Sequence, residues 1–450
     1  MRAFLITAMQ SGAGKTVMSC ALMAALKQKG LTVNAFKSGP DYIDPMFHRR
    51  VLGVESRNLD LFLQGEEGVR RSFRKTSGDV AIVEGAMGYY DGLNGGTEAS
   101  AWDLACRLNL PAVLVLRPKG SGLTLAAQVR GIQTFRQDSR ICALLLADCS
   151  ERLAGYLMPV LERECGLPVL GYMPHMSEAE LESRHLGLLT AEEIEDFTAR
   201  MDRLAEQISR TADLERLISL AAEGPSDKGA AAEAAANSEP VCRIAVARDE
   251  AFCFQYADNL DALRRAGAEL LYFSPLRDCG LPEADGLYLC GGYPELFAGQ
   301  LAANESMRTD IAKKVRSGLP TVAECGGFLY LQQSLEDAEG RPQPMCGVLP
   351  GRGFRTGHLQ RFGYLTLSAE RDSMLLRRGE RLPAHEFHYW DSTENGSDLR
   401  AEKTDGRSWG CGCADRTVYA AFPHLHFGGE LPLAERFAEA CVKYRKHEED

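Results

Sequence analysis

Short, uninterrupted apolar runs alternate with helical patterns along the first part of the chain, and this alternation restricts the fold more than any other feature. The sequence predicts buried strands at 3–9, 80–84, 112–116 and 141–147, and helices at 17–29 and 98–109. Continuous apolar runs of this length are typical of parallel strands that helices cover on both faces. The first part of the chain is therefore predicted to be an α/β domain with a parallel sheet.

The apolar pattern stops at residues 222–240, where Ala, Glu, Gly, Ser and Pro predominate as they do in linkers. New apolar runs follow at 242–247, 269–273, 285–290 and 320–323. For a chain of 450 residues, a typical domain size of about 150 residues predicts two large domains or three smaller ones. We expect one α/β domain at 1–221, a linker at 222–240 and a second α/β domain at 241–450.

The composition excludes several classes of function. With 51 basic and 62 acidic residues, the net charge of −11 leaves no basic surplus for a nucleic acid or an anionic membrane. The sequence has no apolar stretch of about 18 residues, and its first apolar run is too short for a signal peptide. The 14 cysteines form no C-x-x-C pair, as expected of thiols in a reducing compartment. We expect a cytoplasmic monomer or homodimer without a nucleic-acid or membrane partner.

A glycine-rich turn follows the first predicted strand and opens the first helix. Its residues are Ser11, Gly12, Ala13, Gly14, Lys15 and Thr16. Glycines let backbone N–H groups approach phosphate oxygens, the helix N-terminus favours the anion, the lysine reaches the outer phosphates and the threonine hydroxyl binds Mg²⁺. Met9 stands where the strict motif has its first glycine. Because the turn lies between a strand and a helix, it predicts a nucleotide site.

Charged side chains elsewhere in the first domain extend this predicted site. Glu84 ends a strand at the carboxyl edge of the sheet, where ligands bind in open α/β folds. Lys37, Asp41 and Asp44 lie in the proline-containing segment FKSGPDYIDP, and Asp91 follows the Glu84 strand. Alone, this segment would be interpreted as a solvated loop. Beside a phosphate-binding turn, it is predicted to face the same cleft.

The second domain carries a candidate nucleophile at a strand-to-helix turn. Cys325 follows the predicted strand at 320–323 and precedes two glycines and a helical pattern. This order is typical of a nucleophile elbow, and a helix N-terminus favours a thiolate. Gly291 and Gly292 end an upstream strand, and their N–H groups, with that of Gly326, are predicted to form an oxyanion hole.

Two histidines near the C-terminus supply a candidate base. His424 and His426 follow the predicted strand VYAAF, and in a strand both side chains would project to the same face. We interpret His424 as the base that partners Cys325 and His426 as the residue that orients it. Zinc binding is the alternative, although no third ligand lies at metal spacing.

Ten short motifs occur in a fixed order along the chain: SGAGKT, FKSGPDYIDP, SRNLD, VEGAMGYYDG, SRHLG, GGYPELFA, AECGGFLYL, RFGY, HEFHYW and HLHF. Together they resemble the cobyrinate a,c-diamide synthase family, the glutamine-dependent amidases of corrin synthesis. The resemblance spans nearly the whole chain. It implies a dethiobiotin-synthetase-like P-loop NTPase domain followed by a flavodoxin-like class I glutamine amidotransferase domain.

The resemblance implies a specific reaction, in which the a and c acetate carboxylates of cobyrinate are amidated. Glutamine would be hydrolysed at Cys325, and the ammonia would attack an acyl phosphate formed from ATP. A carboxylate is a poor electrophile until phosphate becomes its leaving group, so ATP is required. Mg²⁺ would be held by Thr16 and Glu84 with Asp41, and Lys15 with Lys37 would stabilise the γ-phosphoryl charge.

A polycarboxylate corrin needs local cations on an acidic protein. The resemblance makes four residues candidates for binding it: Arg57, Arg184, His185 and His388. Asp44 and Asp91 would position a corrin side chain or Mg²⁺. The family's amidotransferase relatives place a carboxylate two residues after the catalytic histidine, where this chain has His426.

Two departures from the family pattern concern the nucleotide base. Arg117 stands where the family has an aspartate, and Ala147 stands where it has an asparagine expected to read adenine. We therefore expect altered nucleotide selectivity.

Two other functions stay open from the sequence. One is the same chemistry on hydrogenobyrinate or nickel-sirohydrochlorin. The other is an ATP-dependent P-loop switch protein without synthase activity, which would leave Cys325, His424 and the second domain without a role.

Overall fold

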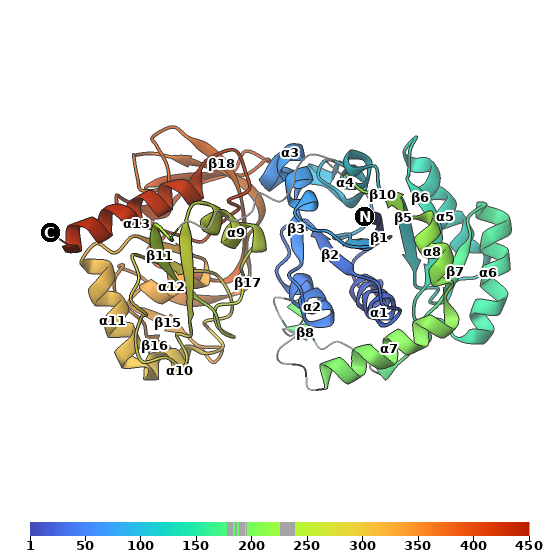
Figure 1. The fold of residues 1–450 in the computed structure, drawn as a ribbon, viewed down its shortest axis with the longest axis horizontal. Helices are drawn as coiled ribbons and strands as arrows, with labels where there is room; N and C mark the ends of the chain where they lie inside the picture. The colour runs from blue at the N-terminus through green and yellow to red at the C-terminus, as the bar shows by residue number, and fades with distance from the viewer. Residues whose placement is uncertain (178–182, 185–186, 189–193, 195, 226–238, 450) are drawn as a thin grey trace. The chain divides into compact units, whose positions relative to one another are not determined.

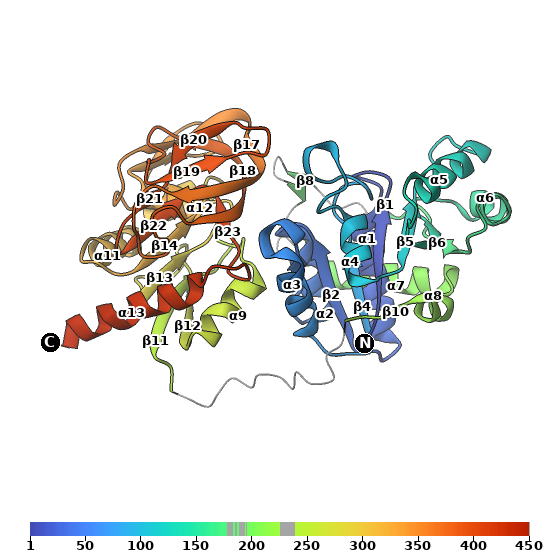
Figure 2. The ribbon, with the colours of Figure 1, turned by 90° about the horizontal axis from the view of Figure 1, so that it is seen from above.

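The computed structural model describes residues 1–177, 183–184, 187–188, 194, 196–225 and 239–449. The chain forms two compact units, Met1–Ala232 and Glu233–Asp450 (Figures 1 and 2). Both units combine helices with a largely parallel sheet, which confirms the predicted α/β class. Among the described residues, no helix has the length and apolar character needed to cross a membrane.

The first unit is built on a sheet with the strand order β3-β2-β4-β1-β5-β6-β7. These strands are parallel, whereas β10 pairs antiparallel with β1 and so extends the sheet into the segment predicted as a linker. The strands of this unit are β1 (Arg2–Ala8), β2 (Val33–Ser38), β3 (Arg57–Leu59), β4 (Val80–Glu84), β5 (Ala112–Leu116), β6 (Ile141–Leu146), β7 (Val169–Tyr172) and β10 (Ala222–Glu223), with a separate β8 (Ser183–Arg184) and β9 (Gly187–Leu188) pair. The four strands predicted here from apolar runs are confirmed.

Helices cover both faces of this sheet, as Figure 1 shows. Helices α3 to α6 share one core with the sheet, whereas α1, α2 and α7 pack together on the other face. The helices are α1 (Lys15–Gln28), α2 (Ile43–Leu52), α3 (Leu61–Arg74), α4 (Ala101–Leu108), α5 (Leu123–Phe135), α6 (Glu151–Cys165), α7 (Phe197–Thr211) and α8 (Leu214–Leu220), with the short η1 (Leu93–Gly95). Helix α1 is buried along most of its length, which explains why its sequence lacks a polar stripe.

The second unit has a sheet with the order β12-β11-β13-β14-β22-β21. Apart from the antiparallel edge strand β21, this is the flavodoxin-like order 2-1-3-4-5 implied by the resemblance. The strands are β11 (Cys242–Ala247), β12 (Ala268–Phe273), β13 (Gly286–Leu289), β14 (Thr321–Glu324), β21 (Cys413–Ala414) and β22 (Val418–Ala421).

The part of the sequence that follows α12 forms a second, mostly antiparallel sheet, which the apolar runs did not predict. Its order is β16-β15-β17-β18-β23, with β19 on β17 and β20 on β19. Both sheets contribute to one apolar core. The strands are β15 (Ser334–Glu336), β16 (Pro342–Pro344), β17 (Arg352–Ala369), β18 (Arg381–Ser392), β19 (Leu399–Glu402), β20 (Ser408–Cys411) and β23 (His424–Leu425).

The helices of the second unit surround its parallel sheet. Helices α9 and α13 pack against each other and on β12, β11 and β13, and α12 directly follows β14. The helices are α9 (Ala257–Arg265), α10 (Ala298–Ala303), α11 (Glu305–Arg316), α12 (Gly326–Leu331) and α13 (Leu433–Glu449). The position of α12 matters most, because its first turn carries the candidate nucleophile.

We predict that Gly327→Ala destabilises the second unit. A Cβ at Gly327 would lie 2.2 Å from the carbonyl oxygen of Leu289 on β13, so α12 would have to move. Overpacking of this kind costs about 1–3 kcal/mol, which corresponds to a fall in melting temperature of several degrees. Scanning calorimetry of the full chain measures it. Gly299→Ala is the control, because nothing lies within 4 Å of a Cβ there, and an unchanged melting temperature for Gly327→Ala would contradict the prediction.

Candidate functional site

The phosphate-binding turn of the first unit joins β1 to α1. Gly12 (φ 74°) and Gly14 (φ 90°) adopt the left-handed conformation that glycine accepts most readily. Gly14 also lies against the second departure from the family pattern, since a Cβ there would be 3.4 Å from the Cβ of Ala147. The turn therefore has the backbone shape that the sequence predicts, with both glycines where the conformation needs them.

Lys15 crosses this turn toward the segment after β4. Its Nζ donates to the carbonyl oxygens of Gln10 (3.1 Å) and Met87 (2.6 Å). Burial and the nearby charge of Lys37 lower the pKa of Lys15 from its usual value to about 8. Asp91 lies close to the same turn. Its Oδ2 accepts the N–H of Gly88 at 2.8 Å, and Gly88 in turn packs against the backbone of Met9.

Two carboxylates and a hydroxyl converge beside Lys15. Thr16 Oγ1 donates to Glu84 Oε1 (2.9 Å) and lies 3.2 Å from Asp44 Oδ1. Lys37 Nζ bridges the same carboxylates, 2.9 Å from Glu84 Oε1 and 2.5 Å from Asp44 Oδ2. The predicted residues Thr16, Lys37, Asp44 and Glu84 are thus brought together on α1, β2, α2 and β4.

The charges in this cluster perturb one another strongly. Burial would lower the pKa of Lys37, but Asp44 and Glu84 raise it above its usual value. Burial, Asp41 and Glu84 raise the pKa of Asp44. Burial would also raise the pKa of Glu84, yet Lys37 and His48 hold it below its usual value. The cluster therefore keeps Glu84 ionised and disfavours a second bare carboxylate at Asp44.

His48 belongs to this cluster and was missed from the sequence. Its Nε2 lies 2.8 Å from Glu84 Oε2 and its Nδ1 lies 3.0 Å from the hydroxyl of Ser56, which itself donates to Ala35 O. The ring is fully buried. A lone histidine in the segment MFHRR gives no sequence signal for such a role, because only the fold brings α2 against β4.

Asp41 has a different place from the one predicted. Its Oδ1 accepts the N–H groups of Ile43 (2.7 Å) and Asp44 (3.1 Å), so it stabilises the start of α2. The carboxylate beside Thr16 is that of Asp44, for which the sequence leaves both a corrin side chain and Mg²⁺ open. These contacts favour Asp44 over Asp41 as the carboxylate that would hold Mg²⁺ with Thr16 and Glu84.

The predicted corrin-binding residues of the first unit are only partly described. Arg57 begins β3 and is half-buried. Arg184 lies in β8, but its side chain is outside the described residues, as is the whole of His185. These three assignments stay predictions.

An ion pair joins Arg117, one of the two departures from the family pattern, to Asp148, the residue that follows Ala147. Arg117 Nε donates to Asp148 Oδ2 at 2.8 Å, and His175 Nδ1 lies 3.0 Å from Asp148 Oδ1. Arg117 is more than a third exposed, so the pair is screened by solvent. Ala147 is buried and bonds by its N–H to Leu116 O.

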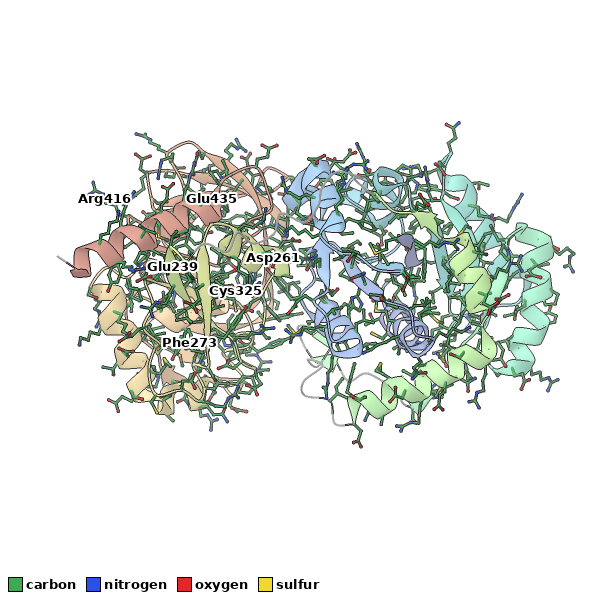
Figure 3. The ribbon with its side chains drawn as sticks, viewed as in Figure 1. Glu239, Asp261, Phe273, Cys325, Arg416 and Glu435 are labelled. Carbon is green, nitrogen blue, oxygen red and sulfur yellow. The ribbon has the colours of Figure 1, made fainter. Side chains whose placement is uncertain are left out.

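In the second unit, Cys325 lies at the junction of β14 and α12, inside the fold (Figure 3). Its φ of 49° and ψ of −103° are unusual for a non-glycine residue and are typical of a nucleophile elbow. Burial, followed by the charges of Glu295 and Glu386, raises the pKa of the Cys325 thiol above its usual value. This direction is opposite to the lowering of the thiol pKa expected from the helix N-terminus, and it agrees with the expected need for a base.

Three glycines pack closely around this cysteine. A Cβ at Gly291 would lie 3.4 Å from Cys325 Cβ, one at Gly292 would collide with Ala251 O at 2.1 Å, and one at Gly326 would lie 3.2 Å from Gly292 N. The backbone N–H of Gly326 interacts with the Cys325 thiol, and the nitrogen of Gly292 lies next to Gly326. This arrangement suits the predicted oxyanion hole.

His424 also lies next to Gly291, since a Cβ there would be 2.5 Å from His424 Cε1. The Nδ1 atom of His424 lies 3.7 Å from Glu324 Oε2. His426 has other neighbours: its Nδ1 accepts the N–H of Gly428 at 3.0 Å and its ring packs on Tyr256. Strand β23 ends at Leu425, so the predicted common strand of the two histidines does not extend to His426. The contacts favour Glu324 over His426 as the group that orients His424.

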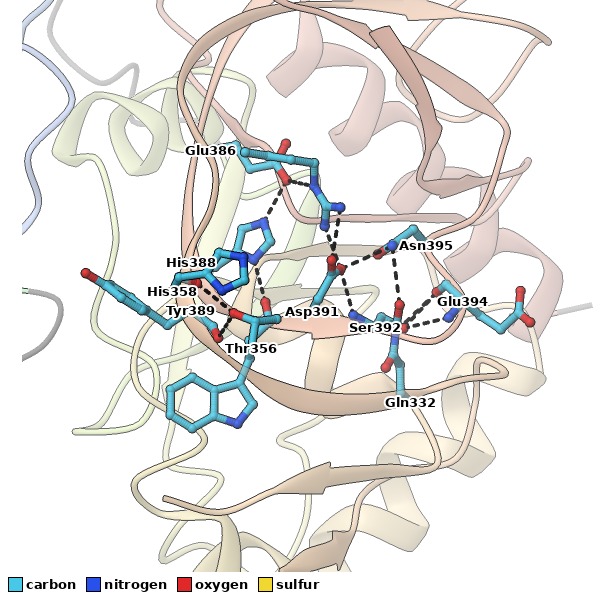
Figure 4. A network of polar contacts seen from close by, with 12 residues as sticks. Gln332, Thr356, His358, Glu386, His388, Tyr389, Asp391, Ser392, Glu394 and Asn395 are labelled. Carbon is cyan, nitrogen blue, oxygen red and sulfur yellow. Dashed lines mark hydrogen bonds and ion pairs between the residues drawn. The ribbon is translucent and has the colours of Figure 1, made fainter. Parts of the chain in front are cut away.

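His388 lies in a network of buried charges on β17 and β18 (Figure 4). Its Nε2 is 2.7 Å from Glu386 Oε1 and its Nδ1 is 2.5 Å from Trp390 O, while its ring stacks on Phe422. Arg361 joins Glu386 to Asp391 in the same network. With both ring nitrogens occupied, His388 has a position that does not favour the predicted contact with a corrin.

Comparison with known proteins agrees with both units. Residues 4–189 match the CobQ/CobB/MinD/ParA nucleotide binding domain, and residues 243–431 match the CobB/CobQ-like glutamine amidotransferase domain. The cobyrinate a,c-diamide synthase of Clostridium tetani is 38% identical, covering 98% of this chain and 100% of that protein. That of Clostridium acetobutylicum is 39% identical over 96% and 98% of the two chains.

This chain belongs to the cobyrinate a,c-diamide synthase family. Membership in the cobyrinate a,c-diamide synthase family confirms the predicted nucleotide-binding and amidotransferase units. It also argues against the P-loop switch protein, since that alternative gives the amidotransferase unit no role. Among solved structures, PurLQS from Thermotoga maritima matches 46% of this chain and all of that one, with 19% identity and a TM-score of 0.32, and we conclude nothing from it.

We predict that nucleotide affinity falls as pH rises through the pKa of Lys15, about 8. Burial depresses this pKa, so the ammonium loses its proton and its attraction for phosphate above that pH. Above it, the Kd for ADP should rise up to about tenfold per pH unit, because each unit lowers the charged fraction tenfold.

Isothermal titration calorimetry with ADP between about pH 7 and about pH 9 measures this dependence. Lys15→Arg is the control, because a guanidinium keeps its charge and should flatten the profile. An equal pH slope in both proteins would show that another group titrates.

Proposed function

We propose that this chain amidates the a and c acetate carboxylates of cobyrinate, using ATP and glutamine. The observation that carries the proposal is the presence, on one chain, of the Lys15–Thr16–Asp44–Glu84 cluster and of the Cys325 elbow facing His424. Relatives of this name match the chain over nearly its full length.

The second unit supplies ammonia in this proposal. The Cys325 thiol gives its proton to His424, and the sulfur attacks the side-chain amide carbon of glutamine. The N–H groups of Gly292 and Gly326 stabilise the resulting oxyanion, and His424 returns the proton to the leaving ammonia. Water then hydrolyses the thioester and releases glutamate. Burial raises the pKa of Cys325 and so favours the protonated thiol, whose proton His424 accepts in this proposal.

The first unit activates the acceptor. ATP transfers its γ-phosphoryl to a corrin carboxylate, and ammonia displaces phosphate from the acyl phosphate. Lys15 and Lys37 place two cations beside the turn that binds phosphate. Lys37 also compensates the buried carboxylates, so its removal would disturb the cluster as well as the nucleotide.

The residues present fit a magnesium ion. Mg²⁺ prefers oxygen ligands and usually takes one or two carboxylates together with substrate phosphates. Thr16, Asp44 and Glu84 offer a hydroxyl and two carboxylates within one cluster, and a divalent cation would offset the repulsion that raises the pKa of Asp44. In the described part of the chain, no set of three or more His, Cys, Asp or Glu side chains is arranged for a metal. When bound, Mg²⁺ neutralises phosphate charge.

A cytoplasmic location and a monomeric or homodimeric state stay predictions from the sequence.

We predict that Cys325→Ala abolishes glutamine-dependent synthesis and leaves ammonia-dependent synthesis largely intact. The thiol serves glutamine hydrolysis, whereas the first unit accepts free ammonia. Purified protein is incubated with cobyrinate, ATP and Mg²⁺, with either nitrogen donor, and the products are measured by mass spectrometry. The wild type should convert two carboxylates to amides in succession.

Equal loss with both donors would contradict the two-site interpretation. If the wild type does not amidate cobyrinate but does amidate hydrogenobyrinate or nickel-sirohydrochlorin in parallel assays, that compound is the acceptor instead of cobyrinate.

We also predict weak discrimination between ATP and GTP. An asparagine pairs with the adenine edge, whereas Ala147 has no polar side chain and Asp148 is engaged by Arg117. Losing such a contact costs about 1–3 kcal/mol, or a preference of about one to two powers of ten. Steady-state kcat/KM values with each nucleotide measure it, and a preference for ATP above about 10³ would show that another group reads the base.

A further inference from the structure

Glu324 is a buried carboxylate next to the nucleophile that the steps above do not use. It ends β14, and its side chain is about 1% exposed. Oε1 accepts the N–H of Leu425 at 3.2 Å, and Oε2 accepts the hydroxyl of Tyr288 at 3.2 Å. Oε2 also lies 3.7 Å from His424 Nδ1. A buried charge with this many polar neighbours indicates a specific role.

The opposite edge of the His424 ring faces the nucleophile. A Cβ at Gly291 would lie 2.5 Å from His424 Cε1, 3.4 Å from His424 Nε2 and 3.4 Å from Cys325 Cβ. The space that a Gly291 side chain would fill is therefore bordered both by the Cε1–Nε2 edge of the ring and by the cysteine. With Nδ1 toward Glu324, Nε2 is the nitrogen directed to the thiol.

We propose that Glu324 is the positioning residue that completes the glutaminase triad by holding the His424 ring with its proton on Nδ1. This inference rests on the proposed roles of Cys325 and His424. When the thiol proton moves from Sγ to Nε2, the imidazole becomes positively charged, and the carboxylate beside Nδ1 stabilises that charge. The carboxylate comes from the residue before the nucleophile, because the position two residues after His424 is occupied by His426.

Asn259 and Tyr288 hold the carboxylate and the segment that carries His424. Asn259 Nδ2 donates to Leu425 O at 2.8 Å, and Asn259 Oδ1 accepts the N–H of Phe427 at 2.7 Å. Asn259 Nδ2 is also 3.5 Å from the Tyr288 hydroxyl. The network thus fixes the backbone on both sides of Leu425 while Tyr288 orients Glu324.

Other titratable groups around His424 have fixed protonation near neutral pH. His385 lies opposite His424 on β18, and burial, followed by His424, lowers its pKa to about 3. Burial and Glu324 raise the pKa of Tyr288, and burial with Glu295 and Glu386 raises that of Cys325. His426 is two residues further along the chain and packs on Tyr256. His385, Tyr288 and Cys325 therefore do not change protonation near neutral pH.

The test is Glu324→Gln in the full-length enzyme, which preserves shape and removes the charge. We expect the kcat of glutamine hydrolysis to fall by about 100-fold or more, with a change of less than about threefold in KM. The acid limb of kcat/KM should move to lower pH by about one unit, because the imidazolium loses its counter-charge. Ammonia-dependent synthesis should persist. Glu324→Asp should recover part of kcat, since it restores the charge.

Glutaminase activity within about threefold of wild type, or a large loss with an unshifted acid limb, would overturn the proposal. If Glu324→Gln also loses ammonia-dependent synthesis, the variant has misfolded. The Tyr288→Phe variant then tests whether Glu324 positions His424. That variant should lower kcat about three- to tenfold, whereas the equally buried Tyr330→Phe should not. Equal activities for the two phenylalanine variants would overturn the proposal. Failure of the proposed glutaminase itself is distinguished by Cys325→Ala, which would then leave glutamine-dependent synthesis unchanged.

Discussion

Parallel strands deliver their carboxyl ends to one edge of a sheet, and the chain must then turn sharply into a helix. Each unit places its chemistry at such a turn: Gly14 before α1, and Cys325 before α12. Both residues have positive φ, which glycine accepts at no cost and which a cysteine accepts at a cost of about 1–3 kcal/mol. The surrounding core, with Gly327 against β13, must therefore hold the elbow in place.

The sequence predicts the elements that depend on local pattern. Strands such as β4 and β11 are buried on both faces, so their apolar runs are unambiguous, and the glycines of both turns reflect local backbone shape. The antiparallel sheet was missed because its longest strand, β17, is exposed or only partly buried over most of its length and pairs with the distant segments β18, β15 and β19. Such pairing has no short-range signature.

Individual site residues were harder to assign than motifs. The segment FKSGPDYIDP lies beside the phosphate-binding turn as predicted, but the sequence does not distinguish the surroundings of Asp41 from those of Asp44. One carboxylate accepts backbone N–H groups at the start of α2 and the other contacts Thr16, a distinction set by a single helical turn. Likewise Glu324 and His48 act through partners far away in sequence, so only the tertiary fold reveals them.

Gly291 keeps a space open in the second unit. A Cβ there would overlap His424 Cε1 at 2.5 Å and would lie 3.4 Å from Cys325 Cβ. The imidazole and the cysteine therefore border one space that residue 291, having no side chain, leaves unfilled. Any larger residue at this position would crowd the two groups between which the proton is proposed to move, so the absence of a side chain is itself a requirement of the chemistry.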